Sequence, residues 1–135
     1  MNVLLVGEDA ALLEGLAQSF AALGYTPRVA LSLHDAREGA VIDPPLLAVI
    51  DSALAAEASS DALAIQLSPG GALVLYHGSS GDRPVIPPTL QRAVMADLAL
   101  PLERNRLIAL AQRVSERVRA TGRSRRETPP EQQAF

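Results

Sequence analysis

The chain has 135 residues, no cysteine and a formal net charge of −3, and its apolar residues are mainly Ala, Leu and Val. This length suits one domain with one core, and the missing cysteine excludes disulfides, thiolate metal sites and cysteine nucleophiles. The net charge gives no sign of the basic surface typical of nucleic-acid binding. Its first apolar run, residues 3–6, is too short for a signal peptide or a membrane span, so we expect a cytoplasmic protein with no membrane partner.

Hydrophobic periodicity predicts strands and helices in alternation along the chain. In chain order these are a strand over residues 3–6, a helix over 10–23, a strand over 25–30, a short helix from 33 towards 40, a strand over 46–50, a helix up to 67, a strand over 72–76, a brief helix over 89–95, a strand over 98–100 and a last helix through 118. Five strands that alternate with helices predict an open parallel sheet covered on both faces.

Polar residues and prolines mark where several of these elements begin or end. Asp9 and Ser32 are placed to cap the first two helices, and Ser59 or Ser60 is placed to cap the third. Pro27 favours the edge of the sheet for the second strand, because proline cannot donate a hydrogen bond to a neighbouring strand.

The carboxyl-terminal segment differs in composition from the rest of the chain. From residue 121 onward the sequence is polar and contains Arg and Pro, so we predict a domain over residues 1–120 and a disordered tail or linker over 121–135. Arginines at positions 119, 123, 125 and 126 form a basic cluster there. Such a cluster could contact nucleic acid or an acidic partner, but a solvated linker is the simpler interpretation.

Polar residues follow three of the predicted strands. Glu8, Asp51 and His77 each stand at the carboxyl end of a strand. In open α/β sheets, ligands bind beyond the carboxyl ends of the strands, at the point where strand order reverses. We therefore expect any functional site at this edge of the sheet.

With these elements in place, the sequence resembles the receiver domain of response regulators over residues 2–119. Three segments carry the resemblance: residues 3–9, an apolar strand followed by acidic residues; the strand that ends in Asp51; and residues 98–102, where the family has a strand ending in Lys-Pro-Phe. The resemblance implies a flavodoxin-like, five-stranded parallel sheet in the order 2-1-3-4-5, with helices on both faces. It also implies a role in two-component signal transduction.

The family's chemistry depends on five positions, of which two keep a suitable residue here. Two acids and an acceptor aspartate hold Mg²⁺, a cation that prefers oxygen ligands, while a Thr or Ser and a Lys contact the phosphoryl group. The resemblance places the two acids at Gly7 and Glu8 and the acceptor at Asp51. It places the Thr or Ser at His77 and the Lys at Leu100.

Other family positions also differ. The aromatic residue that moves inward on activation corresponds to Asp97, and a register slip of one residue would put Tyr76 in place of His77. These differences imply a degenerate receiver, or pseudo-receiver. We expect no cofactor, and Mg²⁺ only if Glu8 and Asp51 still form a working pocket.

Three residues at this edge admit two interpretations each. Asp51 is either a phosphoacceptor or a polar strand-end residue in a retired site. Asp9 either forms a shifted acidic pair with Glu8 or caps the first helix. His77, which has no evident partner in the sequence, is either a phosphoacceptor or general base, or a surface or loop residue.

The leading functional hypothesis is a phosphorylation-independent interaction module rather than an enzyme. It would bind a signalling protein, such as a histidine kinase, or a second copy of itself through the last helix and the neighbouring strand. Prolines at 84, 87 and 88 are expected to shorten or displace the helix before that strand. The alternatives are a receiver still phosphorylated on Asp51 and a small flavodoxin-like enzyme or ligand binder, for which no recognisable cofactor loop is present.

Overall fold

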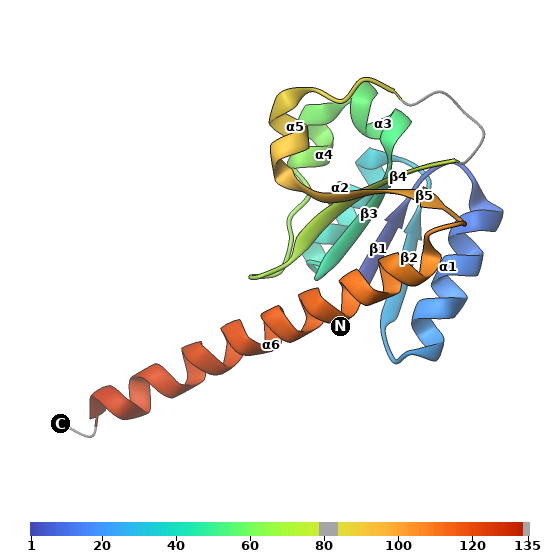
Figure 1. Cartoon of the computed structure of the whole chain (residues 1–135). Helices are drawn as coiled ribbons and strands as arrows, with labels where there is room; N and C mark the ends of the chain where they lie inside the picture. The colour runs from blue at the N-terminus through green and yellow to red at the C-terminus, as the bar shows by residue number, and fades with distance from the viewer. Residues whose placement is uncertain (79–83, 134–135) are drawn as a thin grey trace.

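The computed structural model describes residues 1–78 and 84–133, with side chains described as far as Thr121. Its five strands form one parallel sheet in the order β2-β1-β3-β4-β5 (Figure 1). The strands are β1 (Asn2–Val6), β2 (Thr26–Ala30), β3 (Leu47–Asp51), β4 (Ala72–Gly78) and β5 (Val94–Leu100). The predicted fold class and strand order are confirmed, and Pro27 lies in an edge strand as expected.

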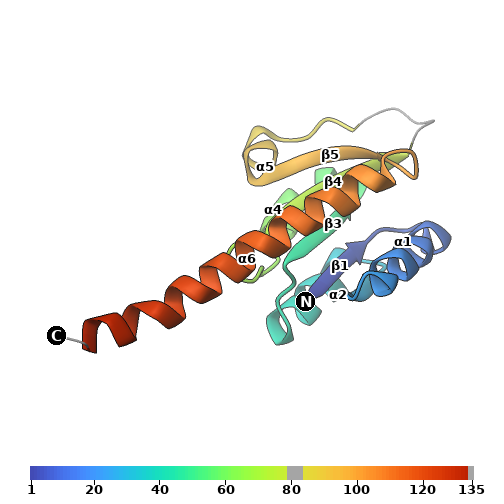
Figure 2. The ribbon, with the colours of Figure 1, turned by 60° about the horizontal axis from the view of Figure 1, so that its bottom comes forward.

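Helices cover both faces of the sheet. They are α1 (Ala10–Ala22), α2 (Leu33–Ile42), α3 (Ser52–Glu57), α4 (Ser59–Leu63), α5 (Pro88–Ala93) and α6 (Arg104–Gln133). One core contains residues of α1 and α6, and the other contains residues of α2, α3, α4 and α5. Figure 2 shows α6 lying across its face of the sheet.

Buried strands supply both cores with alternating side chains. In β1, Val3 and Leu5 belong to the core under α1 and α6, whereas Leu4 and Val6 belong to the opposite core. A strand buried on both faces needs an uninterrupted apolar run, which explains why residues 3–6 and 46–50 were recognisable in the sequence. The first polar positions come where these runs end, at one edge of the sheet.

The predicted caps of the first two helices are present. Asp9 Oδ1 accepts a hydrogen bond from the Leu12 N–H at 3.1 Å, and Ser32 Oγ accepts one from the Asp35 N–H at 3.2 Å. Gly24, just beyond α1, has a φ of +91°, a conformation that glycine adopts without strain.

The segment between β3 and β4 differs from the prediction. A helix starting near Ser59 and ending at Leu67 was expected; instead α3 begins directly after β3, and α4 ends at Leu63 without a side-chain cap. The earlier start has a physical cause, because Asp51 itself caps α3 and an alanine-rich stretch follows it.

β5 is also longer than predicted. The helix expected over residues 89–95 ends at Ala93, and residues 94–97 join the sheet. Pairing with β4 therefore prevails over helix formation, with a register irregularity between Leu73 and Val74.

The last helix extends well past the sheet in both views (Figures 1 and 2). Its backbone is helical to Gln133, through most of the segment predicted to be disordered. The division into a domain over 1–120 and a tail or linker over 121–135 stays a prediction. Within the described part of the chain, no helix combines the length and apolar character needed to cross a membrane.

Candidate functional site at the carboxyl edge of the sheet

The fold brings the predicted site positions to one edge. Gly7 follows β1, while Asp51, Gly78 and Leu100 end β3, β4 and β5. The register pairs Asp51 with Tyr76 and Gly78 with Leu100, so neighbouring strand ends lie side by side. The site predicted from the sequence therefore exists as a spatial cluster.

Asp51 is part of a helix cap. Its Oδ1 accepts a hydrogen bond from the Ala53 N–H at 2.9 Å, which satisfies one of the free amides at the start of α3. Asp9 performs the same task for α1, as the capping interpretation of that residue predicted. Two of the acidic groups at this edge thus have structural partners within the chain.

Tyr76 fills the space beside Gly7. A Cβ atom built on Gly7 would lie 2.0 Å from Tyr76 Oη and 3.5 Å from Asp51 Cβ. Tyr76 is 3% exposed, and its hydroxyl finds no hydrogen-bond partner among the described residues. Burial raises the pKa of this phenol well above its ordinary value, and the negative charges of Asp51, Asp9 and Glu8 raise it further. Tyr76 is therefore a neutral phenol at neutral pH.

His77 belongs to a polar cluster on the opposite face of β4. Its Nδ1 lies 2.9 Å from Asp97 Oδ1, and its side chain is 11% exposed. Ser52 Oγ donates to the Tyr76 carbonyl at 2.6 Å and lies 3.5 Å from the same Asp97 oxygen. The interpretation of His77 as a surface or loop residue without a partner is wrong, because it lies in β4 and contacts Asp97.

Leu100 is a core residue. It is 1% exposed and belongs to the same apolar cluster as Tyr76, Leu98 and Leu107. The position that the resemblance assigns to a cationic Lys therefore holds an aliphatic side chain surrounded by other apolar groups. It can provide no charge to a phosphoryl group.

The residues at this edge do not fit the Mg²⁺ that the receiver family implies. Glu8 and Asp51 offer carboxylates, but Gly7 has no side chain, and the Tyr76 hydroxyl lies where a ligand at position 7 would extend. One oxygen of Asp51 already accepts the Ala53 N–H. Mg²⁺ demands near-octahedral oxygen coordination at short distances, and a buried phenol ring in that space opposes it.

Sequence reasoning missed Tyr76 and Ser52 as members of the site. The spacing places Tyr76 at the site only if the register slips by one residue, and Gly7 is the one signal in the sequence that a larger side chain from elsewhere fills the space beside it. Ser52 follows Asp51 directly and is almost fully buried, a position where a hydroxyl needs a partner.

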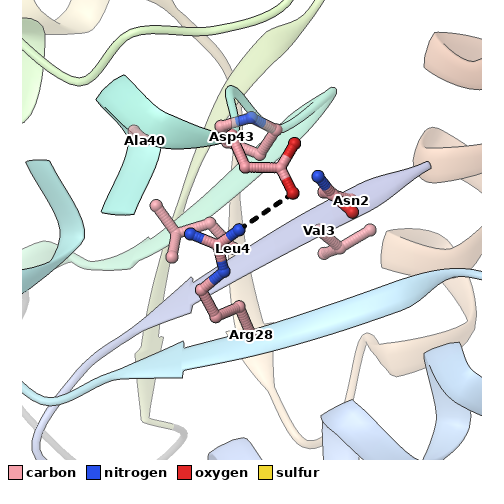
Figure 3. A pocket seen from close by; sticks show the side chains of 7 residues that line it. Asn2, Val3, Leu4, Arg28, Ala40 and Asp43 are labelled. Atoms are coloured by element: carbon pink, nitrogen blue, oxygen red, sulfur yellow. Dashed lines mark hydrogen bonds and ion pairs between the residues drawn. The ribbon is translucent and has the colours of Figure 1, made fainter. Parts of the chain in front are cut away.

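A small hollow near Arg28 lies at the opposite, amino-terminal end of the sheet (Figure 3). Arg28 Nη2 is 3.1 Å from Asp43 Oδ2, and Arg28 Nη1 donates to the Gly39 carbonyl at 2.9 Å. These contacts tie the edge strand β2 to the end of α2. We interpret this hollow as a structural junction.

A larger hollow of about 460 Å³ lies between β5 and α6 and is lined by Met95, Leu110, Arg113, Val114 and Arg117. Arg117 Nε donates to the Gly70 carbonyl at 2.8 Å, which fixes that side chain. Arg113 makes no ion pair or hydrogen bond with the described residues, and it is exposed. The hollow therefore combines an apolar lining with a free positive charge.

Comparisons with known proteins identify the fold. No protein-family model matches the sequence, and no curated protein does either. Among solved structures, the amino-terminal domain of a response regulator/sensory box/GGDEF protein from Carboxydothermus hydrogenoformans is similar, with a TM-score of 0.68 and 18% identity over 90% of this chain and 98% of that one. A CheY-like receiver domain protein from Methanospirillum hungatei gives a TM-score of 0.64 and 17% identity, covering 93% and 98% of the two chains.

NtrX from Brucella abortus, solved with ADP, is also similar, with a TM-score of 0.63 and 18% identity. The match covers 95% of this chain but only 28% of NtrX. These likenesses show a shared architecture: the chain has the CheY-like, flavodoxin-like fold of response-regulator receiver domains.

Proposed function

We propose that this chain is a receiver-like signalling domain that binds a protein partner without being phosphorylated. The observation that carries the proposal is the packing of Tyr76 and Leu100 into the places where the receiver resemblance calls for open metal space and a Lys. An incoming phosphoryl group would lose the charge-assisted bond to that Lys, and such bonds are worth about 1.5–3 kcal/mol each. We further propose that the protein is cytoplasmic, that it is not an enzyme and that it binds no nucleic acid.

The hollow between β5 and α6 is the best-supported docking surface for such a partner. Met95 is 41% exposed, and Leu110 and Val114 extend the apolar lining, while Arg113 offers a charge that no residue in the described part of the chain pairs with. A complementary segment would present an apolar side chain flanked by carboxylates. α5 is only six residues long and packs on the opposite face of the sheet, so it does not cover this hollow. A signalling protein such as a histidine kinase, or a second copy of the chain, would supply that segment.

Crosslinking of the full chain in its host cells tests the proposal. Wild type, Asp51→Asn and Arg113→Glu are compared, with Arg119→Glu as an exposed control outside the hollow. We expect the crosslinked partners to persist in Asp51→Asn and Arg119→Glu and to be lost in Arg113→Glu. Partners lost in Asp51→Asn but retained in Arg113→Glu would contradict the proposal.

An amide NMR titration with Mg²⁺ and beryllofluoride, which mimics an aspartyl phosphate, tests the alternative of a receiver phosphorylated on Asp51. The proposal predicts no saturable shifts near Glu8, Asp51 and His77. Saturable shifts that disappear in Asp51→Asn would favour the alternative.

A further inference from the structure

Gly7 and Tyr76 are sterically coupled across β1 and β4. Any side chain at position 7 would begin 2.0 Å from the Tyr76 hydroxyl and 3.2 Å from its Cζ. The first distance is far shorter than van der Waals contact between two heavy atoms. Position 7 can therefore carry a side chain only if the residue at position 76 is smaller or oriented differently.

Tyr76 has little freedom to move away. Its carbonyl accepts the Ser52 hydroxyl at 2.6 Å, and its side chain belongs to the buried cluster that contains Leu98 and Leu100. Both the backbone and the ring are thus held from neighbouring elements. The hydroxyl is aimed at an acidic edge yet has no partner there among the described residues, and leaving a buried polar group without a hydrogen bond is unfavourable.

A side chain at position 7 would also stand beside Asp51. The Cβ position of residue 7 lies 3.5 Å from Asp51 Cβ, so an aspartate there would bring two carboxylates within reach of a single ion. Two adjacent carboxylates attract a hard divalent cation. The phenol of Tyr76 occupies the volume that a carboxylate at position 7 would take, and it supplies no negative charge.

We infer that Tyr76 is the residue that excludes divalent cations from this edge, and that exchanging Tyr76 and Gly7 together creates a cation site with Asp51. The inference rests on the part of the proposed function that says this edge holds no working metal pocket. Its failure and the failure of the docking surface are distinguishable, because Mg²⁺ binding is measured at the carboxyl edge of the sheet without a partner, whereas the docking surface is tested by Arg113→Glu.

Titration of the purified full chain with Mg²⁺, followed by amide NMR, tests the inference in wild type, Tyr76→Val, Gly7→Asp and the double variant. We expect no saturable shifts in wild type and saturable binding in the double variant. That binding should weaken by roughly tenfold or more when Asp51→Asn removes a ligand charge. Saturable, Asp51-dependent binding in wild type would overturn the inference, as would a folded double variant that binds no Mg²⁺.

Thermal unfolding of milder variants tests the steric coupling without any metal, and it remains informative if the double variant fails to fold. Gly7→Ala should lower the unfolding midpoint by several degrees in wild type and by much less in a Tyr76→Val background. Equal losses in the two backgrounds would overturn the coupling. Tyr76→Phe, which removes only the hydroxyl without a hydrogen-bond partner, should unfold at the same temperature as wild type or higher. A clearly lower midpoint would mean that the hydroxyl is hydrogen-bonded and does more than fill space.

Discussion

At the carboxyl edge of the sheet, the ends of β1 and β3 carry acidic side chains, whereas β4 and β5 carry a buried phenol, a histidine–aspartate contact and a leucine. In the first half, Asp9 and Asp51 accept backbone amides at the starts of α1 and α3. In the second half, Tyr76 and Leu100 share one apolar core. Glu8 and Asp51 in the first half are residue types that the receiver resemblance calls for, whereas Leu100 in the second half is not.

The difference shows that acidic residues at a strand end are weak evidence for phosphoryl chemistry. A capping aspartate contributes about 1 kcal/mol to folding through its hydrogen bond alone, with no metal or phosphoryl group involved. The positions on β4 and β5 are stronger evidence for or against phosphoryl chemistry, because a Lys at position 100 would have no structural role in an apolar cluster.

Leu100→Lys is expected to have the largest effect of the predicted substitutions. It removes apolar packing and buries an ammonium group in the core, at a cost of about 3 kcal/mol or more. Leu102→Lys is the matched control, because Leu102 is 76% exposed and its exchange should cost about 0.5 kcal/mol or less. Chemical denaturation measures both. A Leu100→Lys variant as stable as wild type would mean that the carboxyl end of β5 accommodates a cation after all.

Ser52→Ala tests the polar cluster on the other face of β4. The substitution leaves the buried Tyr76 carbonyl without its side-chain donor and should lower the free energy of unfolding by about 1–2 kcal/mol. Ser60→Ala provides the control, because Ser60 is exposed and makes no side-chain hydrogen bond with the described residues. If both variants unfold alike in denaturant, the Ser52 contact contributes nothing to holding β4 and α3 together.

Asp51→Ala and Asp51→Asn separate capping from charge in the acidic half. Alanine removes the cap and should cost about 1 kcal/mol, whereas asparagine caps as well as aspartate and should cost only a few tenths. The same pair of substitutions at Asp9 should behave alike, since Asp9 caps α1. The free energy of unfolding is measured with and without Mg²⁺. If Asp51→Asn loses more stability relative to wild type when Mg²⁺ is present, the Asp51 charge binds metal.

Much of the fold could be predicted from the sequence because buried parallel strands require uninterrupted apolar runs. Residues 3–6 and 46–50 satisfy that requirement, and Asp9 and Gly24 bracket α1 as expected. α3 could not be predicted in the same way, because the apolar run marks Asp51 as the end of a strand and does not show that the same aspartate also begins a helix. The early start of β5 was missed because residues 94–97 alternate between partly buried and exposed positions, a pattern too short to outweigh a helical interpretation.

The residues of the candidate site could be predicted from the sequence, but the contacts between their side chains could not. Gly7 and Leu100 could be recognised as departures from the receiver pattern directly from their residue types. The approach of Tyr76 to Gly7 depends on the direction of a side chain at the end of β4, which spacing alone does not give. The His77–Asp97 contact depends on the β4–β5 register, which shifts by one residue between Leu73 and Val74.

Glu103 gives the smallest predicted effect and extends the comparison to the β5 half of the edge. Its Oε1 accepts the Ala99 N–H at 2.8 Å and its Oε2 lies 2.9 Å from Arg106 Nη1. The bond from Ala99, followed by that from Arg106, holds the pKa of this carboxyl below its ordinary value of 4.5. Its ionised form therefore stabilises the fold above that pH, and the contribution disappears as the pH falls through the lowered pKa.

Glu103→Gln should accordingly make the unfolding midpoint depend less on pH in the acid range. It should also cause a small loss of stability at neutral pH. Glu116→Gln removes the same charge from α6 at an exposed residue without a hydrogen bond or ion pair to the described residues, and it serves as the control. An equal change in both variants would assign the effect to net charge. A change confined to Glu103 would mean that this carboxylate satisfies a backbone amide of β5, just as Asp9 and Asp51 satisfy amides at the starts of helices.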